Sequence, residues 1–215
     1  RNAAMGTWSL EQKIVPPSGM GSLWFGYAVA IDGDRLAVGA PNYNGAFTSQ
    51  GVAFVYSRVV ATGGGATWNL EQTINDPAPG SAFTFGSAVG LSGAHLVVTA
   101  PGADAPGPIE SAGKVVFFER TGAGANPWTQ ATGGGFTSTP TANDGTGFCA
   151  AIQGNWAFVG SPTGDQPAGG IDAGFVSVYR WNGSQWASIA SVAASDNPST
   201  DQPPQRKRLS ASRPR

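Results

Sequence analysis

Two segments of the chain decide its fold: FGYAVAIDGDRLAVGAP at residues 25–41 and FGSAVGLSGAHLVVTAP at residues 85–101. The second begins 60 residues after the first, and a more divergent copy, TGFCAAIQGNWAFVGSP, occupies residues 146–162. After each copy come a variable polar loop and then an apolar segment that starts with glycine, at 51–56, 113–118 and 174–179. Self-similarity at a fixed period is typical of repeat architectures, in which each repeat is one supersecondary unit.

A segment that begins with tryptophan completes the unit. WSLEQKI at 8–14 returns as WNLEQTI at 68–74, and Trp128 and Trp186 stand near the next two expected positions. Apolar and polar residues alternate through these segments, which is typical of a half-exposed strand. The other segments are apolar or small on both faces, as in a strand covered on both sides by neighbouring sheets. The unit therefore contains four strands, and the tryptophan strand is the outer one.

We predict an all-β fold built from β-propeller blades of four antiparallel strands. Residues 1–190 would hold three blades, at about 15–74, 75–134 and 135–190, together with an orphan outer strand at 8–14. Closed propellers contain about four to eight blades. We therefore expect this arc to be part of a larger or an oligomeric propeller.

Composition excludes several classes of protein. The formal net charge is −1, which gives no general attraction for nucleic acid. A single cysteine, Cys149, can form no internal disulfide and no cysteine-ligated zinc site. No segment approaches the roughly 18 apolar residues that a membrane helix needs. Residues 191–215 form a Pro/Ser-rich basic tail, which we expect to be a disordered linker or anchor.

The frame from Phe25-Gly26 to Gly39-Ala40-Pro41 resembles the FG-GAP repeat of integrin α-subunit propellers and of bacterial secreted proteins. The resemblance implies a secreted or cell-surface propeller that binds protein or glycan through loops on one face, without catalysis. FG-GAP repeats of the integrin type often carry an Asp-x-Asp-x-Asp-Gly calcium loop, because a hard cation needs six or more oxygen ligands. Residues 32–34 are too short for such a loop, so we expect no calcium and no other cofactor here.

Candidate ligand-binding residues are aromatic and acidic side chains in the connections that a propeller gathers on one face. They are Trp24, Tyr43, Phe47, Phe83, Asp104, Asp165 and Asp172. The alternative is that these are solvated loop residues without a ligand, since loops are polar by default.

No catalytic or metal-binding residue is expected, so we predict that the chain is not an enzyme. The only histidine, His95, occupies a position that is Arg35 in the first repeat and Trp156 in the third. Cys149 takes the place of a repeated alanine, which predicts a small buried side chain. For the repeated tryptophans we favour packing between blades over sugar stacking.

These expectations point to an extracellular binding or adhesion module that engages protein or carbohydrate. The alternatives are a lectin-like propeller with sugar sites between its blades, and a structural scaffold within a larger secreted protein. The expected partners include further blades, from a parent chain or from a homo-oligomer, and exclude nucleic acid and a membrane span.

Overall fold

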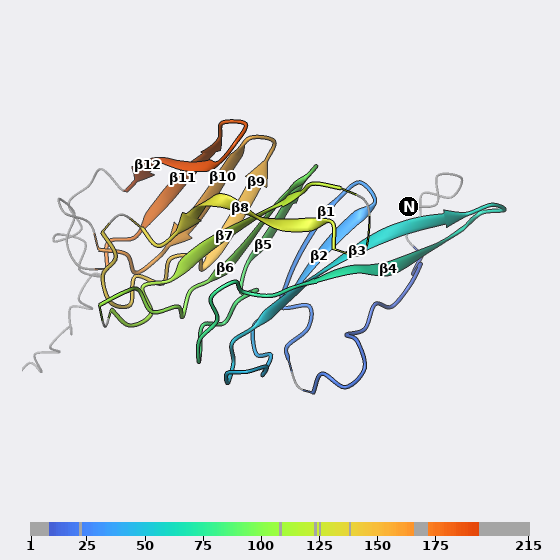
Figure 1. Cartoon of the computed structure of the whole chain (residues 1–215), viewed down its shortest axis with the longest axis horizontal. Helices are drawn as coiled ribbons and strands as arrows, with labels where there is room; N and C mark the ends of the chain where they lie inside the picture. The colour runs from blue at the N-terminus through green and yellow to red at the C-terminus, as the bar shows by residue number, and fades with distance from the viewer. Residues whose placement is uncertain are drawn as a thin grey trace, which may run out of the picture.

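A computed structural model of the protein describes residues 9–21, 23–107, 109–122, 124, 126–137, 139–165 and 172–193. Twelve β-strands and no helix lie within these residues, which confirms the all-β prediction (Figure 1). Trp8 and nearly all of the predicted tail, residues 194–215, lie outside the described residues.

The strands form three consecutive sets of four antiparallel strands, as predicted. A single parallel pairing, of Trp186 with Gly133, joins the second and third sets into one eight-stranded sheet. Blade 1 consists of β1 (Ala28–Asp32), β2 (Arg35–Ala40), β3 (Val52–Ala61) and β4 (Gly65–Ile74). Blade 2 consists of β5 (Val89–Ser92), β6 (His95–Ala100), β7 (Lys114–Arg120) and β8 (Trp128–Gly135). Blade 3 consists of β9 (Cys149–Gln153), β10 (Trp156–Ser161), β11 (Phe175–Trp181) and β12 (Trp186–Val192). Within each blade the strands are hydrogen-bonded in chain order.

The three blades pack face to face, with their first strands β1, β5 and β9 side by side (Figure 1). Successive residues of β6 show why its sequence is apolar on both faces. Val98 packs into a core cluster shared with blade 1, whereas Val97 packs into a second cluster shared with blade 3. Both valines are fully buried, as a strand between two neighbouring sheets requires.

The connections separate into two ends of the arc. The tight turns after the first and third strands of each blade lie at one end, which we call the hairpin face. The longer connections lie at the other end, which we call the loop face. Their described residues are 15–21, 23–27, 41–51, 75–88, 101–107, 109–113, 136–137, 139–148, 162–165 and 172–174.

The segment at residues 9–14, where the orphan outer strand is expected, follows the outer edge of blade 1 without forming a β-ladder. It is attached through a side chain, because Gln12 accepts the Trp68 N–H at 2.7 Å and donates to the Trp68 carbonyl at 3.2 Å. Farther along, Ile14 and Leu23 pack against the apolar face of blade 1. The N-terminal segment therefore covers part of the face that looks away from blade 2.

The opposite end of the arc is uncovered by the described residues. Large apolar side chains of blade 3 are exposed there: Phe148, Trp156, Phe158, Val176, Ile189 and Val192. Cys149 is exposed with them, so the prediction of a buried cysteine is wrong. Its counterpart Ala28 packs into the core shared with blade 2, whereas the described residues provide no neighbour for the matching face of blade 3.

Main-chain hydrogen bonds hold each blade to the next at the loop face. In the first junction, the N–H groups of Ala82, Thr84 and Phe85 donate to the carbonyls of residues 48, 49 and 50, at 2.8 to 3.0 Å. In the second junction, the N–H groups of residues 143, 145 and 146 donate to the carbonyls of residues 110, 111 and 112. The same three bonds recur, so the junction belongs to the repeat.

A glycine makes this approach possible in both junctions. Gly51 and Gly113 have φ values of +80° and +76°, and a Cβ on either would lie within 2.3 Å of main-chain atoms of the following blade. Both the positive φ and the contact therefore demand glycine. This explains why a glycine precedes the third strand of blades 1 and 2.

We predict that Gly113→Ala lowers the free energy of unfolding by about 3 kcal/mol or more, because the new methyl would lie 2.2 Å from the Thr146 carbonyl oxygen. Gly26→Ala is the matched control, since Gly26 has a φ of +88° and nothing within 4 Å of its Cβ position. That variant should lose only the roughly 1–2 kcal/mol of left-handed backbone strain. Equal losses in urea titrations of the two variants would contradict a close blade contact.

Candidate binding surface

All seven candidate residues lie on the loop face, at the ends of the three blades. Trp24 is 61% exposed and stacks on Tyr27, and Phe47 is 42% exposed. Tyr43 and Phe83 are only partly buried, but each packs against a core cluster. Trp24 and Phe47 are therefore the candidate aromatic residues most available to a ligand.

The acidic candidates have structural partners within their own loops. Asp104 Oδ1 accepts the N–H of Ser111 at 2.9 Å, and Asp165 Oδ1 accepts the N–H of Asp172 at the same distance. Asn44 does the same for Ser49 in blade 1. These side chains therefore shape the loop between the second and third strands of each blade. Asp104 and Asp172 nonetheless remain exposed to solvent.

The loop face is acidic. Its connections contain no lysine or arginine, while they carry exposed carboxylates at residues 104, 110 and 172. Lys114, at the start of β7, is buried instead: its Nζ pairs with Asp76 Oδ2 at 2.8 Å and lies over the Phe83 ring. The exposed aromatic and acidic groups suit a neutral hydroxylated or a basic partner better than an anionic one.

The outer strand of blade 1 is joined to blade 2 by a glutamate and a glutamine, a pair that we call the latch. Across the first junction, Glu71 accepts two hydrogen bonds from Arg120 and one from the indole N–H of Trp128. The adjacent Gln72 accepts the Trp128 main-chain N–H at 2.8 Å and donates to its carbonyl at 2.9 Å. Both partners belong to blade 2, so the Glu-Gln pair fixes the distance between the two blades.

The N-terminal segment makes the same latch on blade 1. Glu11 forms a bidentate pair with Arg58, with both hydrogen bonds at 2.8 Å, and Gln12 holds the main chain of Trp68. The hydrogen bonds from Arg58 hold the pKa of Glu11 below its ordinary value of 4.5. Residues 9–14 therefore occupy the position of an outer strand of a preceding blade.

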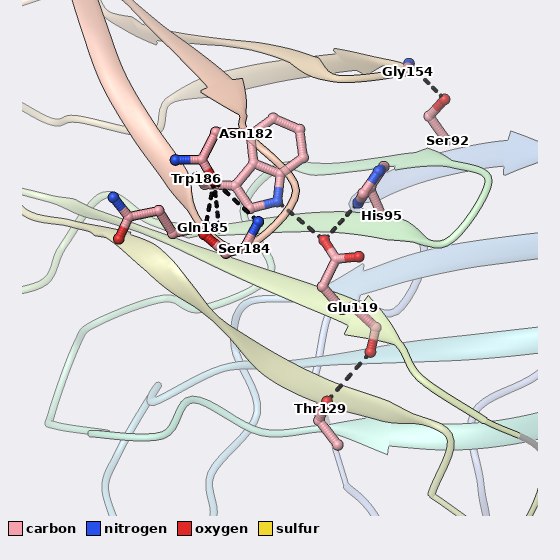
Figure 2. Close-up of polar contacts among 9 residues, drawn as sticks. All are labelled: Ser92, His95, Glu119, Thr129, Gly154, Asn182, Ser184, Gln185 and Trp186. Carbon is pink, nitrogen blue, oxygen red and sulfur yellow. Dashed lines mark hydrogen bonds and ion pairs between the residues drawn. The ribbon is translucent and has the colours of Figure 1, made fainter.

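The second junction keeps the function of the latch with different residues. Ala131 and Thr132 stand where Glu71 and Gln72 would be expected, and Trp181 replaces the arginine. Figure 2 shows that the Trp186 indole N–H instead reaches Glu119 of β7, at 3.1 Å, with the His95 ring on the same carboxylate.

In the second junction a main-chain pairing takes the place of the contact that the Gln72 side chain makes in the first. Gly133 pairs directly with Trp186, and a Cβ at Gly133 would lie 1.8 Å from the Trp186 carbonyl oxygen. Trp186 stacks on Phe117 at 4.5 Å and is buried, as Trp128 is at the other junction. The expectation that the tryptophans pack between blades is thus confirmed for these two residues.

The hairpin face carries a further set of tethers between blades. Asp32 Oδ2 accepts the N–H of Gly93, and Ser92 Oγ accepts the N–H of Gly154 at 2.9 Å. A calcium loop would use the carboxylate of the first hairpin as a ligand. Here that carboxylate, on Asp32, accepts a hydrogen bond from the first hairpin of the next blade. Among the described residues, no group of three or more histidine, cysteine or carboxylate side chains is placed to hold a metal.

The latch was visible in the sequence as the repeated Glu-Gln of the two tryptophan segments, together with the arginines at 58 and 120. Sequence reasoning missed it because these side chains belong to different repeats. Only the stacking of consecutive blades brings them together.

Comparison with known families agrees with this geometry. A family model described as the FG-GAP repeat matches residues 8–56, which contain the N-terminal latch segment, β1, β2 and the first half of β3. Residues 8–56 resemble an FG-GAP repeat. No curated protein matches the chain. Among the described residues there is no helix of the length and apolarity that a membrane crossing requires.

We predict that the N-terminal latch depends on pH. Because the folded-state pKa of Glu11 is lowered, its stabilising effect is present above its ordinary value of 4.5 and is lost as the pH falls through the folded-state value. Glu11→Gln should therefore lower the denaturant midpoint in neutral buffer, and the difference from wild type should vanish in strongly acidic buffer. Glu110→Gln, an exposed loop residue, is the control and should have no effect in either buffer. A pH-independent difference for Glu11→Gln would exclude an ionic latch.

Proposed function

We propose that the chain is a non-catalytic binding or adhesion module of a secreted or cell-surface protein, which engages protein or carbohydrate through its loop face. The observation that carries this proposal is the FG-GAP match on blade 1, on an all-β arc of propeller blades. The blades are rigid, since main-chain bonds, latches and hairpin tethers join each pair. Binding residues on loops that a rigid scaffold positions are a common arrangement.

The loop face offers suitable groups for such a partner. Trp24 and Tyr27 form an exposed aromatic pair, with Phe47 exposed on the neighbouring loop of the same blade. Aromatic side chains contribute much of the energy in protein interfaces and present flat faces to sugar rings. The absence of lysine and arginine from these connections argues against a nucleic acid partner.

We predict that the chain binds members of a glycan array or of a panel of extracellular proteins, and that Trp24→Ala combined with Phe47→Ala weakens this binding at least about ten-fold. Val60→Ala is the control, because Val60 is 59% exposed but lies on the outer hairpin of blade 1, away from the loop face. Binding that is unaffected by the double variant would exclude the loop face of blade 1. Hydrolysis of generic ester, glycoside or phosphate substrates by the purified protein would contradict the non-catalytic role.

We further propose that another blade of the same kind packs against the open face of blade 3. The open face of blade 3 carries exposed aromatic and aliphatic side chains. Strand β10 shows the difference between its two faces, because Ala157 and Val159 are buried against blade 2 while Phe158 is 44% exposed. Gly174 has a φ of +72°, close to those of Gly51 and Gly113, so the glycine that forms a junction is repeated here as well. No backbone hydrogen bond from another blade reaches the carbonyls of Asp172 or Ala173 within the described residues. The neighbouring blade would come from the rest of a parent chain or from a second copy.

We predict that the 215-residue chain self-associates in solution, and that Phe158→Asp shifts it toward the monomer in sedimentation experiments. Maleimide modification of Cys149 gives a second measure, because a docked blade would cover the thiol. Modification should be slow in wild type and fast in the variant. A wild-type monomer with a freely reactive Cys149 and a sharp cooperative melt would contradict this packing.

A further inference from the structure

A cleft of about 480 Å³ lies between the end of β8 and the third and fourth strands of blade 3. Its volume is within the range of about 300–1,000 Å³ that small-molecule sites occupy. Blade 2 contributes Phe136 and Thr137, which follow β8, and blade 3 contributes Asp165, Phe175 and Ser188.

The repeat shows what normally fills this position. Strand pairing places Gly135 opposite Val115, as Ile74 lies opposite Ala53, so Thr137 corresponds to Asp76. Phe175 and Lys114 each follow the junction glycine, so they correspond as well. The buried ion pair of Asp76 and Lys114 in the first junction is therefore replaced by a threonine and a phenylalanine in the second.

One polar atom in the second junction is without a partner. Thr137 Oγ1 is buried and has no hydrogen-bond partner among the described residues. A buried polar atom of this kind is costly unless a ligand or water satisfies it. The smaller hollow of about 320 Å³ borders the Asp76–Lys114 pair, where Asp76 Oδ2 also accepts no hydrogen bond but has the Lys114 ammonium 2.8 Å away. Thr137 Oγ1 has no such cationic neighbour among the lining residues of the cleft.

The lining combines three chemical groups. Phe136 and Phe175 are partly exposed and offer aromatic surface, while Tyr179 and Trp186 are buried beneath. Hydroxyl groups come from both blades, including those of Thr137 and Ser188. The Asp165 carboxylate uses Oδ1 for its own loop, and no hydrogen bond to Oδ2 is formed within the described residues.

A sugar ring presents an apolar face to an aromatic side chain and hydroxyl groups to acceptors at its rim. An anionic ligand would meet a carboxylate and no cationic side chain among the lining residues. A purely apolar ligand would leave the hydroxyl groups of the cleft unsatisfied. The lining therefore matches a neutral polyhydroxylated ring.

We propose that the cleft between blades 2 and 3 binds a neutral saccharide unit. The ring packs against the phenylalanines, and its hydroxyl groups bond to Asp165, Thr137 and the serine hydroxyls. This proposal rests on the binding function proposed above and assigns its carbohydrate ligand to a different position from the aromatic group on blade 1.

The test is calorimetric titration of the full chain with a panel of free monosaccharides and their methyl glycosides. We expect at least one neutral sugar to bind. Asp165→Asn should weaken that sugar about ten-fold or more, because a hydrogen bond to a charged group is lost while the amide oxygen still accepts the Asp172 N–H. Asp104→Asn is the matched control, since Asp104 has the same loop role in blade 2 but lies outside the cleft, and it should bind as wild type.

A second pair of variants tests the position without removing a carboxylate. Ser188→Trp should fill the cleft and abolish binding, whereas Ile189→Trp, at the adjacent exposed position that does not line the cleft, should not. Thermal unfolding of all four variants shows whether any has lost its fold. If Trp24→Ala with Phe47→Ala removes sugar binding and the cleft variants keep it, the loop face is the site and the cleft proposal is overturned. Absence of binding by every sugar tested, or preferential binding of an alkylammonium or anionic probe, would also overturn it.

Discussion

The close main-chain approach between consecutive blades is the constraint on which the rest of this structure depends. At each described junction a glycine with positive φ lets three N–H groups of one blade reach three carbonyls of the previous blade. Any side chain at that position would push the blades apart. The valines of β6, the stacked Trp186 and the buried Lys114 all lie between blades, so each is buried only because this approach is maintained.

Much of the fold could be predicted from the sequence because the repeat provides its own comparison. Strands, hairpin glycines and blade order follow from the copies at residues 25–41 and 85–101. Contacts between repeats could not be predicted in this way. The pairing of Glu71 with Arg120 joins residues 49 apart, and it depends on how one sheet stacks on the next. Cys149 was wrongly expected to be buried for the same reason, because its environment depends on the following blade.

The candidate loop residues lie together at one end of the blades, and their role in ligand binding stays a prediction. A propeller places such connections at one end of its strands, so their grouping follows from topology alone. Asp104 and Asp165 also cap their own loops, which no spacing in the sequence indicates. The cleft between blades 2 and 3 could not have been found from either repeat alone. In this cleft Thr137 and Phe175 stand where the first junction has the ion pair of Asp76 and Lys114.

The outer-strand contacts of the two junctions are made by different residues. Each blade therefore matches only its own neighbours, and the order of the blades is specific. The outer strand of blade 1 presents glutamate and glutamine, whereas that of blade 2 presents a glycine bulge and relies on Glu119 in the strand beside it. Blade 3 carries Trp181 where the Glu-Gln latch would need an arginine. Duplication of an ancestral unit would initially yield interchangeable copies. These blades have diverged past that stage, and recombination that transposed them would produce mismatched neighbours.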